Sequence, residues 1–119
     1  MRNDDESAEA LLPLPPATFH ILVAVAPGER HGYAIIQEVE RATDGELTLS
    51  AGTLYRSIAR MVEQGLIAEV SRRRTAEEDE RRRYYRITSF GTAVARAEAA
   101  RLAQLLRLAK ASGLTPRTA

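Results

Sequence analysis

The sequence has no cysteine and no tryptophan among its 119 residues, and aromatic residues make up only 5% of it. Without cysteine the chain can form neither disulfides nor a thiolate metal site, so a reducing cytoplasm is the expected compartment. No apolar run is long enough to span a membrane. The acidic start and its short, proline-broken apolar stretch do not match a secretory signal. The length suits one small domain with a segment at either end.

Basic charge is carried almost entirely by arginine, because Lys110 is the single lysine among 17 Lys and Arg residues. Arginine offers a planar fork of donors that suits phosphate and guanine, although the bias also fits a GC-rich genome. The formal net charge is only +1, but it is unevenly distributed. Acidic residues gather in residues 1–12 and basic residues in residues 96–119, so the chain becomes more basic toward its C-terminus.

The sequence also lacks the residue patterns of an enzyme or a metalloprotein. His20 and His31 stand without cysteine or a supporting carboxylate pattern, which makes a poor metal ligand set. Ser50 and Ser57 have no histidine in a triad pattern. The four acids at 77–80 fall in a charged loop, where a carboxylate is neither buried nor fixed enough for acid–base chemistry. We therefore expect no catalysis, no metal and no cofactor.

Three helices are predicted in the first half of the chain, over residues 17–26, about 32–43 and 50–65. Capping and breaking residues bound them, such as Ser50 before the third helix and Gly65 after it. Apolar residues at helical spacing predict the buried positions of each helix. These are Phe19, Leu22, Val23 and Ala26 in the first, Ile35, Ile36 and Val39 in the second, and Leu54, Ile58, Met61 and Val62 in the third. Residues 21–26 are apolar beyond their stripe, so a buried strand is an alternative there.

After the third helix the pattern changes to that of strands. Residues 66–70 and 84–88 flank a charged loop and predict a β-hairpin, and a last helix is predicted over residues 88–112. Three helices followed by a basic hairpin is the order of a winged helix-turn-helix domain. The predicted fold is mainly α with a small β-hairpin. Its parts are a flexible arm (1–12), the winged-helix domain (13–87), a dimerisation helix (88–112) and a tail (113–119).

The second strand of the hairpin has two distinct faces. Arg82, Tyr84 and Arg86 alternate on one side, while Tyr85 and Ile87 alternate on the other. This places one face in the core and leaves a cationic face for the DNA backbone or the minor groove. The alternative is a solvated hairpin whose arginines pair with the acids of its own loop.

The third helix is the candidate recognition helix. Opposite its buried stripe it presents Gly52 and Thr53 near the start, and Arg56 and Arg60 further along. Small residues allow close approach to a DNA groove, and arginines reach phosphates or guanine edges. An ordinary amphipathic surface helix would show the same pattern, so the neighbouring elements decide between the two interpretations.

Leucines of the last helix cover more than one of its faces. A second copy of the chain is the simplest partner for this excess apolar surface; the alternative is a helix that packs only on its own domain. The residues expected in the dimer interface are Val94, Leu102, Leu105, Leu106 and Ala109.

Several motifs in series resemble the PadR family of bacterial transcriptional regulators, over about residues 13–112. They are HGYAII (31–36), SAGTLYRSI (50–58), GLI (65–67), RRRYYRIT (81–88) and Gly91. The resemblance implies a winged-helix homodimer that binds an inverted-repeat operator, usually as a repressor. With the helix pattern, it gives the expected DNA-facing residues: Tyr33, Ser50, Gly52, Thr53, Tyr55, Arg56, Arg60, Arg82, Arg83 and Tyr84.

The sequence departs from the family in three places. Ala51 stands where proline is common, the C-terminal region is short, and no tryptophan is present to stack aromatic ligands between subunits. We expect double-stranded DNA and a second copy as partners, with no membrane. The identity and existence of a small-molecule effector stay open. The alternative function is a winged-helix protein-interaction module whose basic face meets an acidic partner.

Overall fold

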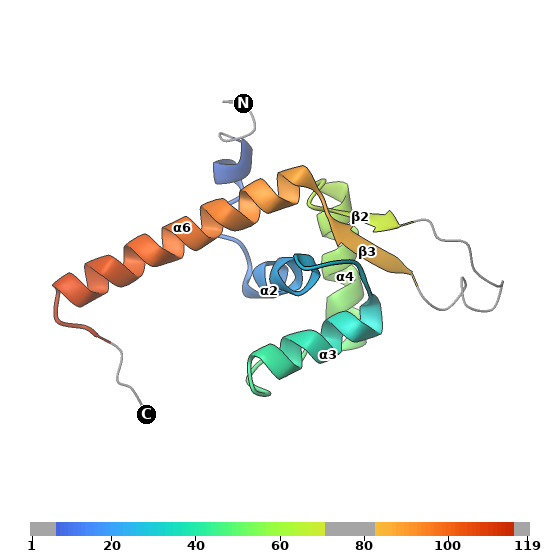
Figure 1. Cartoon of the computed structure of the whole chain (residues 1–119), viewed down its shortest axis with the longest axis horizontal. Coiled ribbons are helices and arrows are strands. Elements are labelled where there is room, and N and C mark those ends of the chain that lie inside the picture. The colour runs from blue at the N-terminus through green and yellow to red at the C-terminus, as the bar shows by residue number, and fades with distance from the viewer. Residues whose placement is uncertain (1–6, 71–82, 116–119) are drawn as a thin grey trace.

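A computed structural model describes residues 7–70 and 83–115. Its elements confirm the predicted fold class, mainly helical with a small antiparallel sheet (Figure 1). They are α2 (Pro16–Val25), β1 (Arg30–His31), α3 (Gly32–Ala42), α4 (Ala51–Glu63), β2 (Ile67–Val70), β3 (Tyr84–Ile87) and α6 (Ser89–Ala111). No helix within the described residues is both long and apolar enough to cross a membrane.

The first predicted helix forms, but its buried face differs from the predicted stripe. Ile21, Leu22 and Val25 are almost fully buried, whereas Val23 is 50% exposed. Phe19 is only partly buried and packs at the edge of the core, and Ala26 is exposed. The prediction was wrong here because α2 is apolar on nearly all sides, so spacing alone cannot select the face that meets the core.

The next two helices begin at side-chain caps. His31 Nδ1 accepts a hydrogen bond from the backbone N–H of Ala34 at 3.2 Å, and Ser50 Oγ accepts one from the N–H of Thr53 at 3.1 Å. Each cap satisfies an amide that the first helical turn leaves unpaired.

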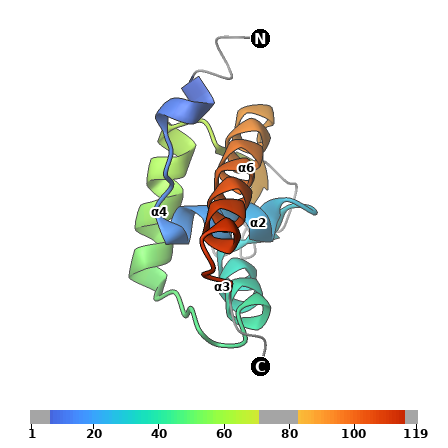
Figure 2. The ribbon, with the colours of Figure 1, turned by 90° about the vertical axis from the view of Figure 1, so that its left-hand side faces the viewer.

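Figure 2, which looks along α6 from its C-terminal end, shows α4 standing to one side of α6.

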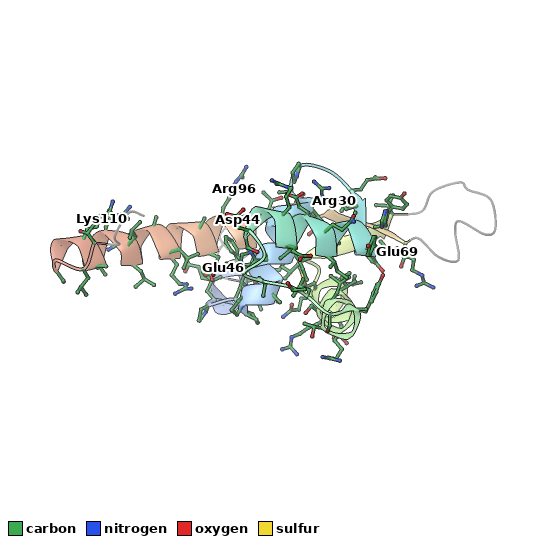
Figure 3. All side chains as sticks on the ribbon, turned by 90° about the horizontal axis from the view of Figure 1, so that it is seen from below. Arg30, Asp44, Glu46, Glu69, Arg96 and Lys110 are labelled. Atoms are coloured by element: carbon green, nitrogen blue, oxygen red, sulfur yellow. The ribbon has the colours of Figure 1, made fainter. Side chains whose placement is uncertain are left out.

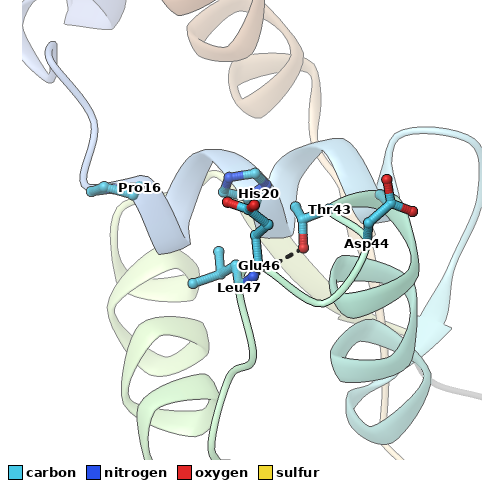
Figure 4. Close-up of a pocket in the computed structure, with 7 residues that line it drawn as sticks. Pro16, His20, Thr43, Asp44, Glu46 and Leu47 are labelled. Carbon is cyan, nitrogen blue, oxygen red and sulfur yellow. Dashed lines mark hydrogen bonds between the residues drawn. The ribbon is translucent and has the colours of Figure 1, made fainter. Parts of the chain in front are cut away.

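The turn between α3 and α4 is held by Thr43. Its hydroxyl donates to the carbonyl of Val39 at 2.9 Å and accepts from the N–H of Leu47 at 3.1 Å (Figure 4). Asp44 and Gly45 both have positive φ, 53° and 81°, which ends α3 as the sequence predicted. The geometry fixes where α4 starts relative to α3.

The predicted stripe of α4 is confirmed at Leu54, Ile58 and Met61, which are at most 3% exposed. Val62 was predicted to be buried and is 41% exposed. Val62 lies about 100° around the helix from Met61, just beyond the face that meets the core.

The sheet has three strands in the order β1-β3-β2, all antiparallel. The hairpin of β2 and β3 was predicted, and β1 was not. In β1, Arg30 pairs with Tyr85 and His31 pairs with Tyr84. A strand of two residues carries no alternation, so no sequence pattern could indicate it.

The junction from the sheet into α6 is closely packed. Thr88 caps α6, since its hydroxyl accepts from the N–H of Gly91 at 2.9 Å and donates to the carbonyl of Leu66 at 3.0 Å. A Cβ atom on Gly91 would overlap that carbonyl oxygen and lie 2.9 Å from the carbonyl carbon. Glycine is therefore required here so that α6 can approach the end of α4.

The N-terminal segment is more ordered than the sequence indicated. We expected a flexible arm over residues 1–12, but residues 7–10 form a helical turn. Ala8 is 2% exposed, and Leu11 and Leu12 pack against the core. Residues 1–6 lie outside the described part. The physical reason for the difference is apolar burial: these side chains cover the core, so the segment is held in place.

Candidate nucleic-acid interface

The exposed face of α4 carries the residues predicted to approach DNA. Gly52, Arg56 and Arg60 are all exposed, on the side opposite the buried stripe. At the start of the helix, Ser50 Oγ donates to Thr53 Oγ1 at 3.1 Å, and Arg56 Nη2 lies 3.5 Å from the same oxygen. The first turn of α4 is thus an organised polar surface with an arginine one turn beyond it.

Gly52 leaves open space at this surface. A Cβ atom built there would meet only Arg56 Nη1, at 3.4 Å. A larger side chain is therefore compatible with the folded domain and would project outward from the face that carries Arg56. Packing within the domain does not require a glycine at this position. A small residue here fits a surface that comes close to another molecule.

Two further residues that were predicted to face DNA are tyrosines. Tyr33, in the first turn of α3, is 63% exposed, and Tyr55, on α4, is 48% exposed. The hydroxyl end of Tyr55 lies against Gly32, the first residue of α3. The ring of Tyr55, which was predicted to face DNA, therefore also links α4 to α3.

The wing contributes an arginine and an aromatic ring. Arg83 is exposed and lies 3.8 Å from Glu69 of β2. Tyr84 is half-buried, and its ring meets that of His31 edge-on, with centroids 5.5 Å apart. Arg82, the other predicted wing contact, and the acidic loop at 77–80 lie outside the described residues.

The opposite face of β3 points into the core, as its alternation predicted. Tyr85 is 5% exposed, and burial raises the pKa of its hydroxyl, with the negative charge of Glu69 adding to the effect. Arg86, the next residue along the strand, is exposed. Tyr85 thus anchors the strand in the core, while Arg86 places a positive charge on the exposed face.

The chemistry available on this surface is hydrogen-bond donation. Guanidinium groups on α4 and β3 can bind phosphates or base edges, and the hydroxyls of Ser50 and Thr53 can donate to phosphate oxygens. Within residues 7–70 and 83–115, no group of His, Asp and Glu side chains is arranged to hold a metal ion.

Two hollows lie away from this surface. One, of about 550 Å³, lies between α2 and the α3–α4 turn and is lined by His20, Asp44 and Glu46 (Figure 4). The other, of about 410 Å³, lies between α2 and α6; it is mainly apolar, with Val23 on one side and Arg96 on the other.

The far half of α6 projects beyond the other elements, with Lys110 near its end (Figure 3). Its leucines are exposed: Leu102 by 41%, Leu105 by 49% and Leu106 by 43%. Val94 differs from the other predicted dimer residues, because it is fully buried within its own chain. It lies in the near half of α6, which packs on α2, and so it belongs to the core.

Sequence reasoning missed the part of the site that joins the elements. The contacts of Gly32 with Tyr55 and of His31 with Tyr84 were not predicted. The pattern of apolar residues finds faces that are buried, but it carries no information on which polar side chains meet across elements. The HGYAII motif at 31–36 singled out His31 and Gly32, but it did not indicate which residues they contact.

Three helices and a three-stranded antiparallel sheet, whose β2–β3 hairpin follows the helices and forms the wing, define a winged helix-turn-helix domain. The chain matches the family model "Transcriptional regulator PadR-like family" over residues 21–97, and it belongs to that family. Members of this family are transcriptional regulators.

Solved structures of transcriptional regulators share this fold. A transcriptional regulator from Clostridium thermocellum is 26% identical, with 78% of this chain and 88% of that chain covered and a TM-score of 0.67. A PadR-like transcription factor from Bacteroides fragilis is 21% identical, with coverage of 80% and 87% and a TM-score of 0.67. A PadR family regulator from Clostridium difficile R20291 is 21% identical, with coverage of 81% and 96% and a TM-score of 0.67. The comparison with curated proteins found no significant match.

Proposed function

We propose that this PadR-family regulator binds an inverted-repeat operator as a homodimer and represses transcription by occupying it. The observation that carries the proposal is the surface of α4, where Gly52 and Arg56 lie side by side with no role in packing. A groove-binding helix needs close approach at one point and a long donor beside it. The exposed Arg83 of the wing adds a contact to the flanking backbone.

The far half of α6 supports the dimer. Leu102, Leu105 and Leu106 expose apolar surface that nothing within residues 7–70 and 83–115 covers. Ala109 lies on the same face and is half-buried. A symmetric pair of such helices would cover the leucines and place two copies of α4 on one duplex, about one DNA turn or a small multiple apart. Val94 is left out of this proposed interface.

The experiment is selection of duplexes from a random library, followed by measurement of binding by Gly52→Leu. The variant should keep its fold, because only Arg56 Nη1 lies near the added side chain. It should lose the selected duplex, because the leucine holds α4 away from the groove. Gly28→Leu is the matched control, since a Cβ atom on Gly28 meets nothing within 4 Å.

Two results would contradict the proposal. One is that the wild-type protein selects no duplex over scrambled ones. The other is that Gly52→Leu binds like Gly28→Leu. In either case, salt-dependent capture of an acidic protein partner by the same surface would favour the interaction-module alternative.

A further inference from the structure

Gly32 and Tyr55 are in direct contact at the point where α3 begins. A Cβ atom on Gly32 would overlap the Tyr55 hydroxyl oxygen and lie 2.9 Å from Cζ and 3.1 Å from Cε1 of the ring. Gly32 is buried within the first turn of a helix and does not have a positive φ. An added methyl group would therefore push against the Tyr55 ring, and the constraint is one of space rather than of backbone conformation, because a side chain of α4 fills that space.

The residue before Gly32 makes the corresponding contact with the wing. His31 caps α3 through its Nδ1 atom, which accepts from Ala34 N–H at 3.2 Å. Its ring meets the ring of Tyr84 on β3 at a centroid distance of 5.5 Å, with the two planes perpendicular. Two consecutive residues thus contact the two parts of the proposed DNA surface, α4 through Gly32 and the wing through His31.

We expect these two contacts to affect the orientation of α4 relative to the wing more than the stability of the domain. Tyr55 is 48% exposed, so it contributes less burial than a core residue such as Leu54, which is fully buried. Sequence-specific binding requires α4 in the groove and the wing on the flanking backbone at the same time. Nonspecific binding depends on phosphate contacts, which tolerate a change in the angle between the two elements.

We propose that Tyr55 is a positioning residue whose packing on Gly32 fixes α4 relative to the α3 N-terminus and the wing, so that both elements fit one operator half-site. Tyr55 acts through Arg56 and the rest of α4 and does not itself select a base. The inference rests on the proposed function, because it assumes that α4 and the wing bind DNA together.

The test compares Gly32→Ala with Gly28→Ala for binding to the selected duplex and to a scrambled duplex. Gly28 is the matched control because an added methyl group meets nothing there. Gly32→Ala should displace the Tyr55 ring and weaken operator binding roughly tenfold, about the loss expected for one base-specific contact. Binding to the scrambled duplex should change much less. Equal losses on both duplexes, or no loss beyond that of Gly28→Ala, would overturn the proposal.

Tyr55 variants keep the test decisive if Gly32→Ala does not fold. Tyr55→Leu removes the contact and should weaken operator binding while leaving the preferred base at every position unchanged. Tyr55→Phe keeps the ring on Gly32 and should bind like the wild type. A change of preference at one base pair in Tyr55→Leu would show that Tyr55 selects a base and would refute the positioning role.

The double variant Gly32→Ala with Tyr55→Leu separates the two mechanisms further. If both changes act by breaking the same contact, the double variant should bind the operator as tightly as whichever single variant binds it less tightly. Multiplied losses would contradict this. If the wild type itself binds no duplex selectively, the proposed function fails; if it does and these variants do not behave as stated, only the positioning role fails.

Discussion

The carboxylate of Glu98 accepts a hydrogen bond from the backbone N–H of Leu14 at 3.2 Å, joining α6 to a residue 84 positions earlier in the chain. The same carboxylate accepts two hydrogen bonds from Arg101, at 2.7 and 2.9 Å. Glu98 is only 3% exposed. It therefore holds the N-terminal segment on α6 through a buried, charge-assisted contact, and its charge is compensated by the arginine one turn further along.

Glu98 should make stability depend on pH on the acidic side. Hydrogen bonding to Arg101, with a smaller contribution from the Leu14 N–H, holds the pKa of Glu98 below its ordinary value of 4.5, against the opposing effect of burial. A lowered pKa means that the stabilisation is present above about pH 4.5 and is lost as the pH falls through the folded-state pKa. Glu98→Gln should cost about 1–3 kcal/mol at pH 7, because it removes a buried charged acceptor.

Urea unfolding of wild type and Glu98→Gln at pH 7 and at pH 3 checks this prediction. The difference in the free energy of unfolding should shrink at the lower pH. Glu40→Gln, on the exposed side of α3, is the control and should change little at either pH. A difference that stays constant would mean that the charge of Glu98 is unimportant.

Gly91→Ala should destabilise the domain by about 1–3 kcal/mol, because the methyl group would force α6 away from the end of α4. The obstacle is the backbone carbonyl of Leu66, which cannot turn aside as a flexible side chain would. Thermal melts of Gly91→Ala and Gly28→Ala give the comparison. Equal melting temperatures would show that the junction can relax.

Charged substitutions on the far half of α6 should yield a folded monomer. In Leu102→Asp with Leu105→Asp, two charges replace the exposed leucines, and their burial between two chains would be costly. Light scattering at micromolar concentration should show about twice the mass of one chain for the wild type and one chain for the variant. Gln104→Asp, on the opposite side of the helix, should remain dimeric. A monodisperse wild-type monomer would rule out the proposed dimer.

Arg83→Ala should weaken binding to the operator and to random duplexes alike. If Arg83 contacts a phosphate, the slope of log affinity against log salt should flatten by about one unit. Arg107→Ala, an exposed arginine on α6, should leave the slope unchanged. A loss confined to the operator would show that Arg83 recognises bases or groove shape instead.

The helices and the hairpin could be predicted from the sequence because each has a strong local signal. Ser50 caps α4 as predicted, and Leu54 and Ile58 are buried as their spacing required. Other features depend on partners that spacing does not reveal. The exposure of Val23 and the burial of Val94 were decided by which face of α2 and which half of α6 meet the core.

Contacts between distant residues were the least predictable part. The ion pair of Glu98 and Arg101 has helical spacing, but the hydrogen bond that Glu98 accepts from the Leu14 N–H depends on where the N-terminal segment lies. The contact of Tyr55 with Gly32 likewise depends on the angle between two helices. Composition and periodicity indicate neither the place of the N-terminal segment nor the angle between the helices. Only the structure therefore shows how the elements of the candidate site are joined.

We expect α4 to recognise DNA through the face that carries Arg56. The most direct measurement is the affinity of wild type, Arg56→Ala and Arg107→Ala for the selected duplex and for each of its single base-pair variants, with circular dichroism as a check on folding. Arg56→Ala should lose about 1–3 kcal/mol of binding and relax the preference at one base pair in each half-site. Arg107→Ala should retain the wild-type affinity and preferences. A folded Arg56→Ala protein with unchanged affinity and unchanged preference at every position would contradict the claim.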